Sequence, residues 1–379
     1  MADLSLTGGT VLLGQDGLQR VDLTVRDGAI DKIGAAASGP ALDVSGLLVL
    51  PGIVDLHGDA FERQIQPRPG VEFPTDLALR DTEAQLLANG ITTAFHGVTL
   101  SWEPGLRSLT AWRAILDALA TGGWTCDMRV HLRWEAYNLE ALETAVADIE
   151  AGRVHLLAFN DHTPSILRKL GDVVEGAKYA GRAGMKMGPF KALAEAVAAR
   201  AGEVPSGLDR IAAAARAAGL PMASHDDDSI ELRDGFRQRG ARICEFPMSE
   251  AVAEAAVAAG DFVAMGCPNV VRGGSHLGWA SAARLAEAGL CTVLTSDYYY
   301  PAMSRAAFIL KERGVLDLAR AWGLISENPA RAGGLTDRGT ITPGKRGDLV
   351  VVDPATSRPV ATIVGGRIAY LSAGLRLAA

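Results

Sequence analysis

The run Pro51-Gly-Ile-Val-Asp-Leu-His57-Gly-Asp59 joins a short apolar segment directly to polar residues. A short, mostly apolar run of this kind is typical of a buried strand in a parallel sheet. In an extended segment, residues two apart project to the same side, so His57 and Asp59 can both reach one ion. Imidazole and carboxylate groups both ligate divalent metals, although the same pair also suits a solvated turn. The run predicts a buried strand that ends at a candidate metal site.

Seven further segments repeat this short apolar pattern, and alanine-rich helical stretches such as 192–201 and 211–218 separate them. Alternating strands and helices predict βα units around a parallel sheet, and eight units match a (β/α)8 barrel, here residues 51–337. A doubly wound open sheet is the competing fold, but no Gly-x-Gly-x-x-Gly turn follows the first strand. The eight predicted strands are Ile53–His57, Thr92–His96, Met128–Trp134, Val154–Phe159, Pro221–His225, Arg242–Phe246, Phe262–Met265 and Cys291–Ser296.

Both ends of the chain have short strand-like segments broken by glycine-containing turns. In the first fifty residues these are 10–13, 21–25 and 29–33, and near the C-terminus they are 347–353 and 359–364, followed by Gly365-Gly366. A Gly-Gly pair between two such segments is a good hairpin turn. Neither end has enough strands for a stable core of its own. We therefore predict one small β-sandwich built from residues 1–50 and 338–379.

The composition of the 379 residues is that of a globular protein, with 48% hydrophobic and 21% charged residues. The net charge of -7 argues against a general nucleic-acid binder, which normally has a basic surface. The N-terminus has no basic export-signal region, and no apolar run is long enough to span a bilayer. The four cysteines form no Cys-x-x-Cys pair, which favours reduced thiols and a cytoplasmic protein without a membrane partner.

Polar residues gather at the predicted carboxyl ends of the strands, where barrel enzymes carry their active sites. Five of the seven histidines lie at or near such an end. His131 and His155 lie inside strands and are expected to be packed, hydrogen-bonded histidines, whereas His96 could contact substrate or be structural. The polar residues near strand ends are His57, Asp59, His96, Glu135, Asn160, Asp161, His162, His225, Asp226, Asp227, Asp228, Glu245, Asn269 and Asp297.

Several of these motifs resemble those of the amidohydrolase superfamily. The run 51–57 is similar to its first-strand signature, and Glu327-Asn-Pro-Ala330 followed by Gly339-x-Ile-x-x-Gly-x-x-Gly-Asp348 resembles its return to the β-sandwich. One branch is matched more narrowly, that of diphosphatases of phosphonate catabolism acting on α-D-ribose 1-methylphosphonate 5-triphosphate. The motifs that resemble this branch are His57-Gly-Asp-Ala-Phe-Glu-Arg63, Pro67-Arg-Pro-Gly70, Asn160-Asp-His-Thr-Pro164, Ser224-His-Asp-Asp227 and Pro268-Asn-Val-Val-Arg-Gly-Gly-Ser275.

The resemblance implies a metal-dependent hydrolase with one or two divalent ions. By position, His57 is the first ligand, His225 the ligand of strand 5, Asp297 that of strand 8, and Glu135 the candidate bridging carboxylate. Two positions depart from the superfamily pattern. Asp59 replaces the second histidine of strand 1, and the histidine expected on strand 6 is absent, so Glu245 is the nearest candidate ligand there. So many carboxylates can share one site only with a cation, and their oxygens make Mn²⁺ or Mg²⁺ as plausible as Zn²⁺.

Positive charge is needed if the substrate is a small phosphorylated sugar. Each basic candidate could instead form a surface salt bridge, which is the favoured interpretation for Lys186. Arg272 and its glycines follow strand 7, where barrels often bind phosphate through backbone amides. The predicted substrate-binding residues are Arg63, Arg68, Asp161, His162, Lys186, Arg272, Gly273, Gly274, Ser275 and His276.

The resemblance further implies that Asp297 orients an attacking water and takes its proton, and that pyrophosphate leaves from the triphosphate. A deacetylase or cyclic-amide hydrolase of the same superfamily is the alternative enzyme, and a catalytically silent scaffold is the alternative from another class. The chain could also form a homo-oligomer.

Overall fold

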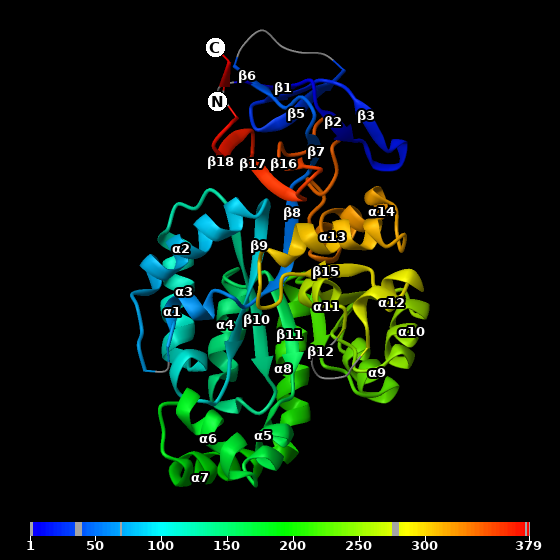
Figure 1. The fold of residues 1–379 in the computed structure, drawn as a ribbon. Helices are drawn as coiled ribbons and strands as arrows, with labels where there is room; N and C mark the ends of the chain where they lie inside the picture. The colour runs from blue at the N-terminus through cyan, green and yellow to red at the C-terminus, as the bar shows by residue number, and fades with distance from the viewer. Residues whose placement is uncertain (1–2, 35–39, 69, 275–279, 376, 379) are drawn as a thin grey trace.

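The computed structural model describes residues 3–34, 40–68, 70–274, 280–375 and 377–378. A β-sandwich lies at one end of the molecule and a larger barrel lies below it (Figure 1). Strand β7 (Leu48–Pro51) belongs to the sandwich, and after Gly52 the chain enters β8 (Ile53–Gly58), the first strand of the barrel. The quoted run 51–59 is therefore the connection between the two parts.

Eight parallel strands form the barrel sheet in consecutive order, and each predicted strand is present. This confirms the predicted (β/α)8 barrel. The strands after β8 are β9 (Ile91–Leu100), β10 (Asp127–Glu135), β11 (Leu156–Asn160), β12 (Met222–His225), β13 (Ile243–Glu245), β14 (Phe262–Gly266) and β15 (Val293–Thr295). The helices are α1 (Glu62–Ile65), α2 (Thr75–Ala88), α3 (Leu109–Thr121), α4 (Leu142–Glu150), α5 (Thr163–Lys169), α6 (Val173–Arg182), α7 (Met187–Ala198), α8 (Val204–Ala217), α9 (Ile230–Gln238), α10 (Glu250–Ala258), α11 (Cys267–Arg272), α12 (Ala282–Glu287), α13 (Ala302–Glu312), α14 (Leu318–Gly323) and α15 (Glu327–Ala332).

Backbone hydrogen bonds between the first and last strands close the barrel at its carboxyl end. The N–H of Asp297 donates to the carbonyl of His57, and the N–H of Asp59 donates to the carbonyl of Asp297, both at 2.9 Å. Below them, the buried carboxylate of Asp55 accepts the N–H of Ser296 at 2.9 Å and its hydroxyl at 2.5 Å. These contacts place residues from opposite ends of the barrel sequence side by side.

Asp55→Ala is expected to lower the free energy of unfolding by about 2–4 kcal/mol, because the buried N–H and hydroxyl of Ser296 lose their acceptors. Asp55→Asn is the matched control, since an amide can accept from the N–H and donate to the hydroxyl. Denaturant unfolding of both variants measures the effect. Equal stability of the alanine variant and the wild type would show that Asp55 does not secure the closure.

The floor of the barrel is apolar. Side chains from seven of its strands form one buried cluster with Ala330, Ala332 and Leu335, which come from α15 and the residues after it. Leu156 and Ala158 of β11 belong to this cluster. In the strand register, His131 of β10 pairs with Leu156 and Arg133 pairs with Ala158. Paired residues of parallel strands project to the same face, so these two side chains point into the barrel above its floor.

Strands from both ends of the chain make up the two sheets of the sandwich, as predicted. Their orders are β19-β6-β1-β4-β5 and β18-β17-β16-β7-β2-β3. Gly365 and Gly366 both have positive φ and form the predicted hairpin turn between β17 and β18. The strands are β1 (Leu4–Thr7), β2 (Thr10–Leu12), β3 (Leu18–Arg20), β4 (Leu23–Arg26), β5 (Ala29–Ile33), β6 (Ala41–Asp43), β16 (Leu349–Asp353), β17 (Arg358–Val364), β18 (Arg367–Leu371) and β19 (Leu377–Ala378).

Helices α5, α6 and α7 form a separate lobe beyond the carboxyl ends of the barrel strands (Figure 1). They pack on a small apolar core that includes Phe190. Trp102, from the loop after β9, stacks on Phe190 and donates its indole N–H to the hydroxyl of Thr163 at 2.8 Å. The lobe is therefore fixed to the barrel rim by aromatic packing.

The second predicted strand is longer than expected, because β9 continues to Leu100. His96 therefore lies inside the strand and not at its end. Its ring packs edge-on against Phe61 at 5.2 Å, and its side chain is buried. His155 accepts the N–H of Val130 at 3.1 Å, as predicted for a hydrogen-bonded histidine, but it is half-buried and lies just before β11, not inside it.

All four cysteines are buried free thiols. Within the described part of the chain, no helix has the length and apolar character needed to cross a membrane. The assignment to the cytoplasm and the possible homo-oligomer stay predictions.

Candidate metal centre and substrate cavity

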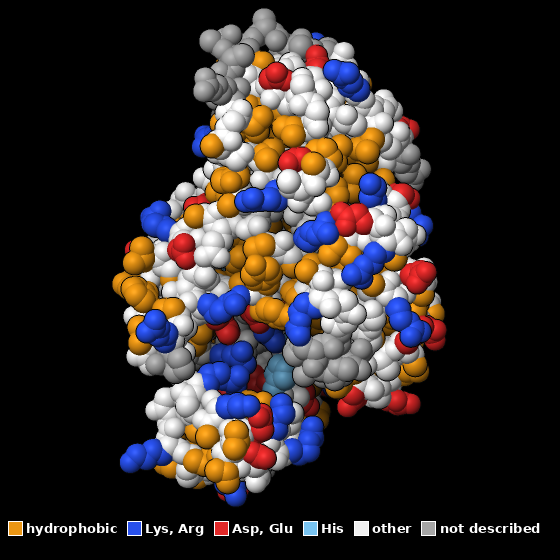
Figure 2. Space-filling view, viewed as in Figure 1, with side chains coloured by type: hydrophobic (Ala, Val, Ile, Leu, Met, Phe, Trp, Pro, Cys, Tyr) orange, Lys and Arg blue, Asp and Glu red, His pale blue; other side chains and the backbone are white. Residues whose placement is uncertain are grey.

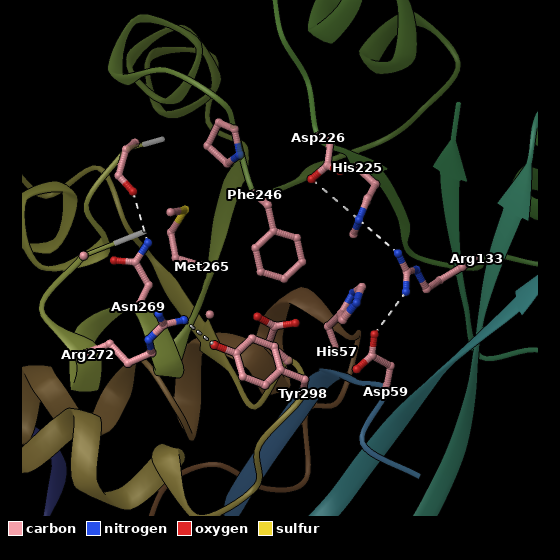
Figure 3. Close-up of a pocket in the computed structure, with 15 residues that line it drawn as sticks. His57, Asp59, Arg133, His225, Asp226, Phe246, Met265, Asn269, Arg272 and Tyr298 are labelled. Carbon is pink, nitrogen blue, oxygen red and sulfur yellow. Dashed lines mark hydrogen bonds and ion pairs between the residues drawn. The ribbon is translucent and has the colours of Figure 1, made fainter. Parts of the chain in front are cut away.

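A cavity of about 170 Å³ opens at the carboxyl ends of the barrel strands. It is lined by residues at or just beyond the ends of strands spread around the barrel, including His57, Arg133, His225 and Tyr298 (Figure 3). Asp297, which follows β15, also lines it. Residues far apart in the sequence therefore share one space, as expected for a barrel active site.

Three buried side chains at the bottom of this region form a possible ligand group: His57, His131 and Glu245. Each offers a ligand atom, and the three atoms lie within 4.8 Å of one another. Oε2 of Glu245 is 3.1 Å from Nδ1 of His57 and 3.9 Å from Nε2 of His131. The carboxylate and two imidazoles are close enough to hold one divalent ion between them.

The hydrogen bond of His131 fixes which of its ring nitrogens is available. Its Nδ1 lies 2.9 Å from the carbonyl oxygen of Leu56, which can only accept, so Nδ1 carries the proton. In the neutral ring, Nε2 then has a free lone pair, and it has no hydrogen-bond partner among the described residues. Histidines that bind a metal through one ring nitrogen usually donate a hydrogen bond from the other, often to a backbone carbonyl.

The charges in this group fit a cation. Burial raises the pKa of Glu245 to about 7, while the nearby His131 and Arg133 oppose the rise. Burial also lowers the pKa of His57 to about 3 and that of His131 to about 4. Neutral imidazole is the form that ligates metals. Oε1 of Glu245 is buried without a partner among the described atoms, and a divalent ion would satisfy both it and the lone pair of His131.

A second possible ligand group lies next to the first and is closer to solvent. It consists of His162, His225 and Asp226, again with ligand atoms within 4.8 Å of one another. The rings of His57 and His225 stack at 5.3 Å, so the two groups adjoin. The structure thus brings two donor groups together at the base of the cavity.

Asp59 and Asp297 line the cavity beside these groups. Asp297 has a φ of 55°, and its backbone is hydrogen-bonded to the backbone of His57 and Asp59. Burial, followed by the negative charge of Asp59, raises the pKa of Asp297 to about 7. Burial likewise raises the pKa of Asp59. Two carboxyl groups therefore face the space where a substrate would lie.

Glu135 has contacts different from those expected of a bridging ligand. Its carboxylate accepts the backbone N–H groups of His162 and Thr163 at 3.2 Å and the hydroxyl of Thr163 at 2.8 Å. Nδ1 of His162 is 3.3 Å away. Among the described residues, Glu135 belongs to neither ligand group. Its contacts fix the start of α5, where they hold His162 beside His225.

The predicted substrate-binding residues are only partly gathered at the cavity. Arg272 and Gly274 line it, and Nη1 of Arg272 donates to the hydroxyl of Tyr298 at 3.3 Å. Arg63 donates to the backbone carbonyl of Tyr298, at the rim. Gly273 has positive φ and ends α11.

His162 belongs to the second ligand group, whereas three other predicted binding residues lie away from the cavity. Arg68, Asp161 and Lys186 are exposed and are not among the described residues that line the cavity. Ser275 and His276 lie outside the described residues.

Sequence reasoning missed two residues, His131 as a possible ligand and Arg133 as a cavity residue. Arg133 is 6% exposed, and its guanidinium lies between Asp59 and His225 (Figure 3). The signal was the alternation His131-x-Arg133-x-Glu135 along β10, which places all three side chains on the inner face.

Comparison with known proteins identifies the class of protein that this fold and cavity belong to. Residues 74–370 match the amidohydrolase family, and the chain belongs to that family of hydrolases, whose superfamily is metal-dependent. The chain is 34% identical over 321 residues to α-D-ribose 1-methylphosphonate 5-triphosphate diphosphatase of Escherichia coli K12, covering 82% of this chain and 84% of that protein.

Other similarities are shorter or concern the fold alone. A dihydroorotase of Citrifermentans bemidjiense is 33% identical over 96 residues, 24% of this chain and 21% of that protein. Among solved structures, molinate hydrolase superposes with a TM-score of 0.65 at 16% identity, covering 97% of this chain and 94% of that one. An amidohydrolase from a Sargasso Sea sample gives 0.66 at 17% identity, covering 98% and 93%.

Proposed function

We propose that this protein hydrolyses α-D-ribose 1-methylphosphonate 5-triphosphate to the 5-phosphate and pyrophosphate, in the degradation of phosphonates. The observation that carries the proposal is its 34% identity, over most of both chains, to the Escherichia coli diphosphatase. Positive charge at the cavity supports it, since Lys and Arg side chains gather around the hollow between the barrel and the α5–α7 lobe (Figure 2). A triphosphate needs such charge for binding.

The proposed metal ligands are His57, His131 and Glu245, with Mn²⁺, Mg²⁺ or Zn²⁺ as the ion. When bound, a divalent ion polarises a phosphoryl oxygen and lowers the pKa of water. Asp297 orients the attacking water and takes its proton. The water oxygen bonds to the α-phosphorus, the α–β anhydride bond breaks, and the electron pair leaves with pyrophosphate.

Substrate turnover tests the proposal directly. The purified protein is incubated with the ribose methylphosphonate triphosphate, ATP and dihydroorotate, in the presence of Mn²⁺, Mg²⁺ or Zn²⁺, and pyrophosphate and ring opening are measured. The ribose substrate is expected to give one pyrophosphate per 5-phosphate, and a chelator is expected to stop the reaction. Faster opening of dihydroorotate, with no pyrophosphate from either triphosphate, would favour the amide-hydrolase alternative.

Arg272→Glu is expected to raise KM for the triphosphate at least about tenfold, because the reversed charge lies on the cavity wall. The change also removes the bond to the Tyr298 hydroxyl, so Tyr298→Phe serves as the control for that contact. Initial-rate kinetics of both variants separate the two effects. An unchanged KM for Arg272→Glu would remove Arg272 from the proposed phosphate contacts.

A further inference from the structure

Arg133 has an unusual place for a positively charged side chain. It projects from β10 into the barrel between the two ligand groups, at the level where the cavity begins. Its side chain is almost fully buried, and an arginine guanidinium is a permanent cation in proteins. A permanent cation is therefore built into the base of the cavity.

The contacts of Arg133 occupy atoms that an ion would otherwise use. Nη2 lies 3.1 Å from Nε2 of His225, and Nη1 lies 3.4 Å from Oδ2 of Asp59. Because a guanidinium can only donate, Nε2 of His225 must be the acceptor and Nδ1 must carry the proton. That proton is directed at Oε2 of Glu245, 3.3 Å away. The lone pair of His225 is therefore used by Arg133.

The contacts of Arg133 therefore leave the two ligand groups with different numbers of free ligand atoms. His57, His131 and Glu245 retain a free lone pair and a free carboxylate oxygen, whereas the second group has its central histidine engaged. A second divalent ion at His162, His225 and Asp226 would have to displace the guanidinium from Nε2 of His225. It would also lie beside that positive charge in a buried site, where repulsion between like charges is strong.

Building on the proposed function, we propose that Arg133 replaces a second metal ion: it restricts the centre to one divalent ion and contacts the phosphoryl group under attack. Nη1 and Nη2 each have one partner and each carry a second N–H, and Arg133 lines the cavity, so donors remain for phosphate oxygens. A planar guanidinium matches phosphate geometry and stabilises charge on the equatorial oxygens in phosphoryl transfer.

The number of bound ions tests the first half of the proposal without any substrate. Mn²⁺ is titrated into the metal-free full-length chain by calorimetry, and bound metal is counted by elemental analysis after gel filtration. The wild type is expected to bind one ion per chain and Arg133→Met two, because Nε2 of His225 becomes free. Arg272→Met removes one positive charge from the same cavity without releasing a ligand, and it should still bind one ion.

Binding of inorganic phosphate to the Mn²⁺-loaded protein tests the second half. Arg133→Lys keeps the positive charge and is expected to bind one ion, but it lacks the planar guanidinium and should hold phosphate at least about tenfold less tightly than the wild type. Circular dichroism checks that each variant is folded, and should the methionine variant fail to fold, the wild-type ion count and the lysine variant still decide. Two ions in the wild type, or unchanged phosphate affinity in the folded lysine variant, would overturn the inference. Neither readout uses the triphosphate, so this result is independent of the proposed diphosphatase activity.

Discussion

Asp297→Asn is expected to lower kcat by about a thousandfold while the protein remains folded. Removal of a positioned general base typically costs two to four orders of magnitude in rate. The fold should survive because the contacts that close the barrel use the backbone N–H and carbonyl of residue 297, not its carboxylate. Asparagine also tolerates the positive φ at this position better than most residues.

Steady-state kinetics, thermal melting and metal content of Asp297→Asn distinguish the possible roles of the side chain. A large fall in kcat with an unchanged ion count and melting temperature supports its role in proton transfer. Loss of the ion would instead make Asp297 a ligand, as its position on strand 8 also implies by resemblance. A rate within tenfold of the wild type would exclude both roles.

The barrel was predictable because its strands are buried on both faces and have short apolar runs that end in polar residues. The run 51–59 shows this clearly, since Ile53 to Leu56 fill the strand and His57 and Asp59 begin the site. The sandwich was predictable from turn chemistry, above all from Gly365-Gly366. The local sequence therefore predicts the position of each strand and the order of the site residues around the barrel.

The interior of the barrel was less predictable, because it depends on strand register. His131 and Arg133 lie within a strand, and only their pairing with Leu156 and Ala158 shows that they face inward. A histidine inside a strand is more often a packed core residue, and the sequence alone does not distinguish the two. The alternating pattern along β10 was the available signal, and its polar members indicate a polar barrel interior.

The loops were the least predictable part of the site. Glu135 ends β10 and has the right chemistry for a ligand, but the backbone N–H groups of residues 162 and 163 donate to its oxygens. Lys186 lies in the insertion after strand 4, and its lobe is positioned by Trp102 and Phe190. Contacts between segments distant in the sequence decide which loop residues reach the cavity.

His131→Leu is expected to weaken Mn²⁺ binding by more than about a hundredfold, because the variant lacks the free Nε2 lone pair in the buried ligand group. Changes to residues that merely orient a ligand typically cost 10- to 100-fold in affinity, and loss of a ligand should exceed this. In the wild type, Mn²⁺ at about 100 times its Kd should stabilise the fold by about 2.7 kcal/mol. The same concentration should leave the melting temperature of His131→Leu nearly unchanged.

His96→Leu is the matched control, since His96 is also a buried histidine inside a strand but packs against Phe61 outside both ligand groups. Both substitutions alter the metal-free melting temperature, so the comparison rests on the shift that Mn²⁺ produces in each variant. His96→Leu should keep the wild-type shift and His131→Leu should lose it. Because a leucine at 131 also leaves the carbonyl of Leu56 without its donor, His131→Asn tests whether restoring a donor alone recovers the shift. If His131→Leu bound Mn²⁺ as tightly as the wild type, the ion would have to be held without residue 131.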